Sequence, residues 1–236
     1  QDAGSHPIIE YTKNLGGAWT TLVLSSSLGS INRTFIKYVN NYFIVAAGSR
    51  TIFYATDPLA TWHMSSITQN AGNGVTDIAC DGSQYALIGN YNGYAYVWLS
   101  ANLSQWTAWG YVGNQLSASG SKIEYADGQW CAVVNNGGYI ALISGFDAGQ
   151  NWTVNSYGGT GYEKNALKWH QGVWYFAGTF ENNGRAFFAK APTFANFTII
   201  DLNLYDTTIH TLDFINEFTV LGGCDRSSQN LQSFTN

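Results

Sequence analysis

Residues 76–106 read TDIACDGSQYALIGNYNGYAYVWLSANLSQW, and this stretch decides the fold. Short apolar runs at Thr76–Cys80, Tyr85–Ile88 and Tyr94–Leu99 are separated by polar segments rich in Asp, Asn and Gly. Those residue types supply the positive φ that tight hairpin turns require. The stretch therefore predicts three hairpin-connected strands, followed by a fourth strand that begins at an aromatic residue, Trp106.

The same unit recurs along the chain with a period of about 44 residues. One aromatic series lies 43 to 46 residues apart, and it consists of Trp19, Trp62, Trp106, Trp152 and Phe197. A second series lies 43 to 45 residues apart, and it consists of Tyr42, Tyr85, Trp130, Trp174 and Phe218. Four short strands per repeat, without sustained helical periodicity, are typical of a β-propeller blade.

The repeats predict an all-β, five-bladed β-propeller with four antiparallel strands per blade, formed by one domain spanning residues 1–236. Residues 1–6 are set aside as a tag remnant or a disordered start. The chain begins with a third strand (Ile8–Tyr11) and a fourth (Trp19–Val23), and ends with a first (Ile209–Phe214) and a second (Phe218–Leu221). We therefore expect a closing blade shared by the N- and C-termini, which would leave no free edge between the first and last blades.

Composition excludes several classes of function. The net charge is −5 with only ten Lys and Arg residues, so the chain lacks the basic face that nucleic acid requires. No apolar run approaches the ~18 residues of a membrane span. The three cysteines form no disulfide scaffold, although a Cys80–Cys131 pair stays open. The four histidines lack metal-ligand spacing, so we predict no transition metal and no cofactor, while a calcium ion or a water molecule in a central channel stays open.

The turn before each fourth strand has its own pattern, seen at Thr12–Trp19, Ala55–Trp62 and Gly145–Trp152. This pattern resembles the Asp box, the S-x-D-x-G-x-x-W repeat of sialidase-like propellers. The repeat departs from it at Ser100–Trp106, which is one residue short, and at Ala191–Phe197, which has neither the acid nor the tryptophan. The resemblance implies a propeller in which these turns lie on the face opposite the ligand site.

The acid or amide of each such turn has a structural explanation. A carboxylate or amide oxygen before a tight turn accepts backbone N–H bonds. The tryptophan that follows packs between neighbouring sheets. We therefore interpret Asn14, Asp57 and Asp147 as structural turn residues.

The arginines are confined to loops that share the opposite face. All four (Arg33, Arg50, Arg185 and Arg226) lie in or beside loops that join blades or join second to third strands. Arginine binds carboxylates and sugar hydroxyls, and the same loops carry Tyr and Asn. Alternatively, arginines gather there because loops are solvated in any fold. The predicted ligand residues are Arg50, Tyr91, Asn92, Tyr157, Tyr162, Asn182, Arg185, Tyr205 and Arg226.

Charged residues also occur in the innermost strands. Lys37, Glu124 and Lys168 align at one repeat position, which Ile78 and Leu212 occupy in the other repeats. Asp77, Lys122, His210 and Asp213 lie nearby in sequence. These side chains either pair across a narrow central channel or are the solvated ends of short strands.

The sequence favours a non-catalytic lectin or adhesin that binds a glycan or cell-surface receptor, and that is secreted, displayed on a cell or carried by a virion. One alternative is a sialidase-like glycoside hydrolase, which needs two carboxylates about 5 to 9 Å apart. Its candidate acids are Glu163, Glu181, Asp206 and Asp225. Another alternative is a coat or tail scaffold that binds a protein assembly partner.

Overall fold

The computed structural model describes most of the chain. It covers residues 8–12, 17–24, 34–47, 50–68, 74–113, 120–134, 139–147, 151–156, 162–180, 184–193, 196–215, 218–225 and 231–235. Residues 1–6 lie outside these ranges. Within them every regular element is a β-strand, as the sequence predicts.

Four consecutive sheets have four antiparallel strands each. The first comprises β3 (Thr34–Val39), β4 (Tyr42–Ala47), β5 (Thr51–Ala55) and β6 (His63–Ser66). The second comprises β7 (Gly74–Cys80), β8 (Tyr85–Tyr91), β9 (Tyr94–Ser100) and β10 (Thr107–Tyr111). The third comprises β11 (Gly120–Ala126), β12 (Gln129–Val134), β13 (Tyr139–Ile143) and β14 (Thr153–Ser156). The fourth comprises β15 (Tyr162–His170), β16 (Val173–Phe180), β17 (Ala186–Thr193) and β18 (Asn196–Asp201).

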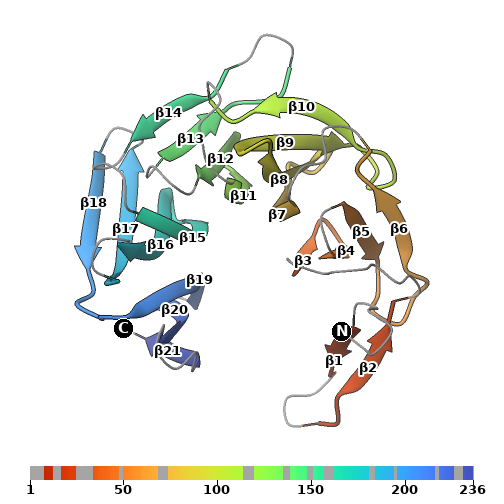
Figure 1. Cartoon of the computed structure of the whole chain (residues 1–236), viewed down its shortest axis with the longest axis horizontal. Coiled ribbons are helices and arrows are strands. Elements are labelled where there is room, and N and C mark those ends of the chain that lie inside the picture. The colour runs from red at the N-terminus through yellow and green to blue at the C-terminus, as the bar shows by residue number, and fades with distance from the viewer. Residues whose placement is uncertain are drawn as a thin grey trace.

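These sheets are the blades of a β-propeller. Figure 1 shows them arranged radially, with the first strand of each nearest the centre and the fourth strand on the outside. Two smaller sheets complete the arc: β1 (Ile8–Tyr11) with β2 (Thr20–Val23), and β19 (Thr207–Ile215) with β20 (Phe218–Asp225) and β21 (Leu231–Thr235).

The shared closing blade does not form among the described strands. The edge of β20 that was expected to receive Ile8–Tyr11 is paired instead with β21, from Val220↔Thr235 to Cys224↔Leu231. The strand Leu231–Thr235 is not predicted by the sequence pattern, in which Phe218–Leu221 is the last expected strand. Among the described strands, β1 and β2 pair only with each other and six sheets are present, so the count of five blades is not confirmed.

Tight turns fix the hairpins between first and second strands. Asn40 and Asn41 have φ values of 47° and 66°, and the pairs Asp127-Gly128 and Gln171-Gly172 also have positive φ at both positions. Two-residue turns with this geometry match the right-handed twist of the flanking strands. Aromatic rings pair across the same hairpins, with centroids 4.8 Å apart in Tyr38–Phe43 and 4.9 Å apart in Trp169–Trp174. Each hairpin is thus fixed by its turn and by a cross-strand pair.

The core lies between neighbouring blades. Trp106 opens the fourth strand of its blade, and its indole N–H donates to Ser65 Oγ of the preceding blade at 3.1 Å. Trp109 likewise donates to the Phe146 carbonyl of the following blade at 2.8 Å. Trp130 is 1% exposed, in a cluster that joins the second and third blades. Trp106 and Trp130 of the two aromatic series therefore mark contacts between adjacent blades, whereas Trp19 of the first series is 63% exposed.

A β-bulge interrupts four of the first strands at one equivalent position. The pairing register shifts at Thr76 in β7, at Ser121 in β11, at Asn165 in β15 and at His210 in β19. A bulge adds one residue to a strand and changes the direction of the side chains that follow. The sequence pattern gives no sign of these bulges.

Candidate functional site

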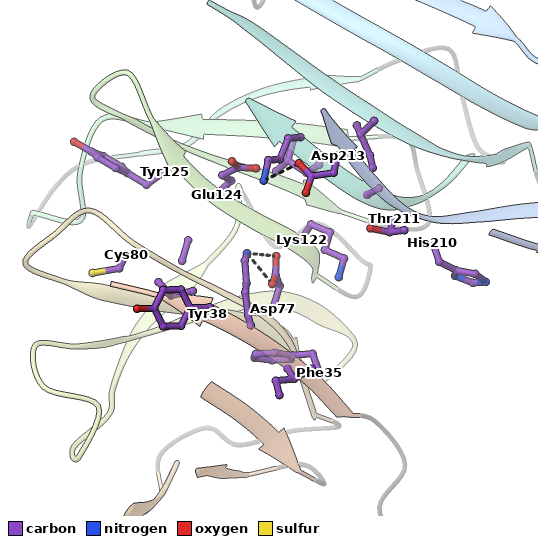
Figure 2. Close-up of a pocket in the computed structure, with 18 residues that line it drawn as sticks. Phe35, Tyr38, Asp77, Cys80, Lys122, Glu124, Tyr125, His210, Thr211 and Asp213 are labelled. Atoms are coloured by element: carbon purple, nitrogen blue, oxygen red, sulfur yellow. Dashed lines mark hydrogen bonds and ion pairs between the residues drawn. The ribbon is translucent and has the colours of Figure 1, made fainter. Parts of the chain in front are cut away.

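The first strands line a central pocket of about 590 Å³. Two tiers of side chains face it, and each tier takes one residue from β3, β7, β11, β15 and β19. The turn-side tier lies two residues before the end of each hairpin ladder, and it consists of Lys37, Ala79, Glu124, Lys168 and Asp213. The bulge-side tier lies two residues earlier, and it consists of Phe35, Asp77, Lys122, Ala166 and Thr211. Figure 2 shows side chains of both tiers around the pocket.

The tiers correct one detail of the predicted alignment. Lys37, Glu124 and Lys168 are equivalent, as expected, but the other two members are Ala79 and Asp213 rather than Ile78 and Leu212. In β7 the ladder extends to Asp81, whose N–H donates to the Gln84 carbonyl at 3.2 Å. In β19 the ladder extends to the pair Ile215↔Phe218. Both features shift the equivalent position by one residue.

Asp77 connects three blades. Its carboxylate lies 3.1 Å from Lys37 Nζ of β3, and its Oδ2 accepts the backbone N–H of Ile123 in β11 at 3.0 Å. Lys37 Nζ also lies 3.5 Å from the Ile123 carbonyl. The Asp77 side chain is only 6% exposed, so this buried charge is compensated by both an ion pair and a backbone donor.

The turn-side tier holds a second ion pair and a carboxyl of unusual acidity. Lys168 Nζ lies 3.4 Å from Asp213 Oδ1, and the Asp213 side chain is well exposed. Burial raises the pKa of Glu124 to about 7, although Lys37, Lys168 and the Trp169 backbone N–H favour its charged form. Near neutral pH this carboxyl is therefore only partly ionised.

Lys122 is half-buried in the bulge-side tier. Among the described residues it has neither an ion pair nor a hydrogen bond. Figure 2 shows it projecting into the pocket between Asp77 and His210. Its charge is therefore available to a molecule in the pocket.

The predicted ligand residues do not converge. Tyr91 and Asn92 lie at the hairpin between β8 and β9, Arg50 is exposed at the start of β5, and Arg185 and Tyr205 flank the fourth blade. None of these five lines either described pocket. Tyr157, Asn182 and Arg226 lie outside the described residues, and of Tyr162 only the strand position is described.

Arg185 is occupied within its own blade. Its guanidinium lies 2.7 Å from Asp201 Oδ2 and 3.4 Å from Asn203 Oδ1. The same group lies over the rings of Phe180 and Tyr205, at 6.0 and 5.7 Å. This arginine fastens the loop after β18 to β17, so the cation that suggested ligand binding contributes to the fold.

Four tyrosines form a cluster on the predicted ligand face of the second blade. We call Tyr91, Tyr94, Tyr96 and Tyr111 the tyrosine cluster, in which Tyr96 and Tyr111 meet edge to face at 4.9 Å. Tyr91 and Tyr111 stack at 6.2 Å, and Tyr94 meets Tyr111 at 5.6 Å. Only Tyr91 of this group was predicted as a ligand residue.

The turns before the fourth strands carry the expected type of contact. Asp57 Oδ1 accepts the Leu59 N–H at 2.7 Å. Asn102 Oδ1 accepts the N–H of Ser104 at 3.1 Å and that of Gln105 at 3.3 Å. Asp147 is exposed, and Asn14 lies outside the described residues. The turn amide at Asn102 had gone unrecognised because its repeat is one residue short.

A second pocket, of about 520 Å³, lies beside these turns between the first and second blades. Tyr54 contacts His63 at 5.4 Å and Tyr42 at 6.0 Å along its wall. The remaining lining residues are Thr56, Ala60, Thr61, Asn102 and Ser104. The described residues that line this pocket include no Lys, Arg, Asp or Glu, in contrast to those of the central pocket.

The cysteines, the candidate glycosidase acids and the possible metal ligands complete the predicted site residues. Cys80 and Cys131 are free thiols, and burial raises the pKa of Cys131 well above its usual range. Of the candidate glycosidase acids, Asp206 is exposed, Glu163 and Asp225 have only described backbone positions, and Glu181 lies outside the described residues. In the part of the chain that is described, His, Cys, Asp and Glu form no group of three suited to a metal ion. No described helix is long and apolar enough to span a membrane.

Comparisons with known proteins identify the fold but not a family. No family model matches the chain, and no curated protein matches it. Among solved structures, YCF48 bound to D1 peptide has a TM-score of 0.64 at 13% identity, over 98% of this chain and 75% of that one. YCF48 from Cyanidioschyzon merolae has a TM-score of 0.65 at 13% identity, over 97% and 76%. These likenesses support the propeller fold, while the sialidase-like assignment is not confirmed.

Proposed function

We propose that this chain is a non-catalytic binding propeller that holds a segment of a polypeptide partner in its central pocket. The observation that carries the proposal is the convergence of ten side chains from five sheets on one pocket of about 590 Å³. Ligand sites are commonly concave and of this size. The three predicted ligand regions of the loop face, by contrast, lie on three different blades.

The chemistry of the pocket suits a peptide better than an apolar small molecule. Its tiers include three lysines and three carboxylates, together with Thr211 and the half-buried Phe35. An extended peptide presents side chains on alternating sides and backbone groups along its length, so it can use both kinds of contact. The bound D1 peptide in a structure of similar fold is a precedent for such a ligand.

The arrangement of carboxylates favours binding over catalysis. A glycosidase needs one carboxyl that donates a proton and a second that is free to attack or activate water. Glu124 has the raised pKa of a proton donor. Asp77 is buried against Lys37 and the Ile123 N–H, so its oxygens are already committed.

Panning a random dodecapeptide display library against the immobilised protein tests the proposal. Thr211→Trp fills the pocket from an exposed position, whereas Thr198→Trp places the same bulk on the exposed outer strand β18. We expect enriched peptides whose binding is lost in Thr211→Trp and kept in Thr198→Trp. Failure to enrich any peptide, or binding that is equal in both variants, would contradict the proposal.

A second candidate function is glycan binding at the tyrosine cluster, and it retains the expectation of a secreted, cell-surface or virion-borne adhesin. The edge-to-face and stacked rings of Tyr91, Tyr94 and Tyr111 form an aromatic surface of the kind on which a sugar ring stacks. A glycan array run with the wild type and with Tyr94→Ala tests this candidate. A signal that disappears in Tyr94→Ala but survives in Thr211→Trp supports it, and a blank array contradicts it.

A further inference from the structure

The charges of the central pocket divide into paired and unpaired groups. Lys37 is paired with Asp77, and Lys168 is paired with Asp213. Among the described residues Lys122 and Glu124 form no ion pair, although Glu124 accepts the Trp169 N–H. Both come from β11, two residues apart and therefore on one face of the strand. The character of the pocket toward a charged ligand thus depends mainly on these two residues.

The bulge in β11 contributes to this placement. The register shift lies between Gly120 and Lys122, so Lys122 is the first residue after the bulge. Bulges change the direction of side chains beside functional sites. In β7 the equivalent residue is Asp77, which is paired, while β15 and β19 carry the uncharged Ala166 and Thr211. Lys122 is therefore the positive charge of the bulge-side tier.

Glu124 is surrounded by charged groups from several strands. Lys37 faces it from β3, Asp77 from β7 and Lys168 from β15, and the buried Cys131 lies behind it on β12. Asp213 and His210 line the same pocket from β19. Because burial keeps this carboxyl partly protonated near neutral pH, it opposes the charge of Lys122 only incompletely.

We infer that the central pocket selects an acidic polypeptide segment, one carboxylate of which pairs with Lys122. The inference rests on the proposed function, since it names the class of peptide for the same site. A partly desolvated lysine without an acidic partner gains more from a carboxylate than from a neutral group. A basic segment would instead place a second positive charge beside Lys122.

The probe is the tightest dodecapeptide from the display experiment, labelled for fluorescence anisotropy, together with its counterpart in which every Asp and Glu becomes Asn or Gln. We expect the selected peptide to be acidic and the amide counterpart to bind about tenfold more weakly. Lys122→Met should cause a similar loss. The matched control Lys190→Met removes a lysine that is exposed on β17, and should leave the affinity unchanged.

The pH dependence supplies a readout that a merely structural role of Lys122 would not produce. As the pH rises from about 6 to 8, Glu124 loses its proton and repels the acidic peptide, so the affinity should fall. Glu124→Gln should remove most of this fall. His210 also lines the pocket, so His210→Gln is measured in parallel to separate its share of the pH dependence.

The outcomes distinguish the inference from the proposed function. A selected peptide that needs an open pocket but lacks acidic residues, or that binds equally well to Lys122→Met, would overturn the inference and leave the proposed function standing. Absence of any pocket-dependent peptide would defeat the proposed function itself. Affinity that is unchanged in Lys122→Met but reduced in Lys190→Met would also overturn the inference.

Discussion

Two ion pairs with similar chemistry differ in what they connect: one links separate blades beside the central pocket, and the other lies within a single blade. Asp77 and Lys37 meet at the centre at 3.1 Å, and Arg185 and Asp201 meet at the rim at 2.7 Å. The central pair joins separate blades and opens on a pocket that all first strands share. The rim pair lies within one blade, and its guanidinium lies over two rings of that blade. The position of a cation relative to the blades, rather than its presence in a loop, therefore decides whether it lies at the shared pocket.

The strongest test of this comparison is removal of the central carboxylate. Asp77→Ala leaves Lys37 without its partner and the Ile123 N–H without its acceptor, so we expect a loss of about 3 kcal/mol in the free energy of unfolding. Urea unfolding measures the loss. The control Asp213→Ala breaks the exposed pair with Lys168 and should cost less than about 1 kcal/mol. Equal losses in the free energy of unfolding for the two variants would show that the contacts of Asp77 between blades add no stability beyond that of an exposed ion pair.

The buried carboxyl of Glu124 should make the stability of the central region depend on pH. Its folded pKa of about 7 exceeds the ordinary value of 4.5, so the native state binds more protons between these values. Its contribution to stability is therefore full below pH 4.5 and is lost as the pH rises through about 7. Glu124→Gln should raise stability above neutral pH by about 1 to 3 kcal/mol and flatten the profile. Thermal unfolding across the pH range checks this, and a steeper profile in the variant would contradict it.

At the rim, Arg185→Met should separate stability from binding. The variant loses the contact with Asp201 and the stacking on Tyr205, which predicts a cost of about 1 kcal/mol in urea unfolding. Peptide binding in the central pocket should not change. If affinity fell together with stability, the rim would belong to the site and the contrast between the two regions would disappear.

The smallest expected effect concerns the turns before the fourth strands. Asn102→Ala removes an acceptor of two backbone N–H bonds, so we expect a loss of about 1 kcal/mol at this exposed turn. Asp57→Ala removes the acceptor of the Leu59 N–H and should cost less. Hydrogen exchange at Ser104 and Leu59 measures the local effect, and equal protection in wild type and variants would contradict it.

The fold was largely predictable from the sequence because blade contacts repeat. Trp106 and Trp130 recur at fixed intervals since each packs against a neighbouring sheet, and Asp127-Gly128 marks a turn that needs positive φ. The terminal strands were harder, because Leu231–Thr235 carries no aromatic-led signal and yet pairs with the edge of β20. Pairing of one edge with either of two short segments depends on the arrangement of all the blades rather than on a local pattern.

The site was only partly predictable. The alignment of Lys37, Glu124 and Lys168 pointed to the centre, since a repeat position shared by charged residues implies a shared environment. The bulges at Ser121 and Asn165 were not foreseen, because an extra residue in one strand leaves no periodic signature. Arginine and tyrosine in loops gave a weaker signal, since Arg185 serves its own blade.

The recurrent bulge also determines which residues of the pocket can be substituted without disturbing the packing between blades. Each bulge presents the next residue to the pocket from a strand whose opposite face is packed between blades, so that residue is exchangeable while the packed face stays constant. Mutating Asp77, Lys122, Ala166 and Thr211 in combination would then generate a family of pockets on one frame. The scaffold is accordingly suited to diversification of its ligand specificity, because a few pocket positions determine recognition and the other positions determine folding.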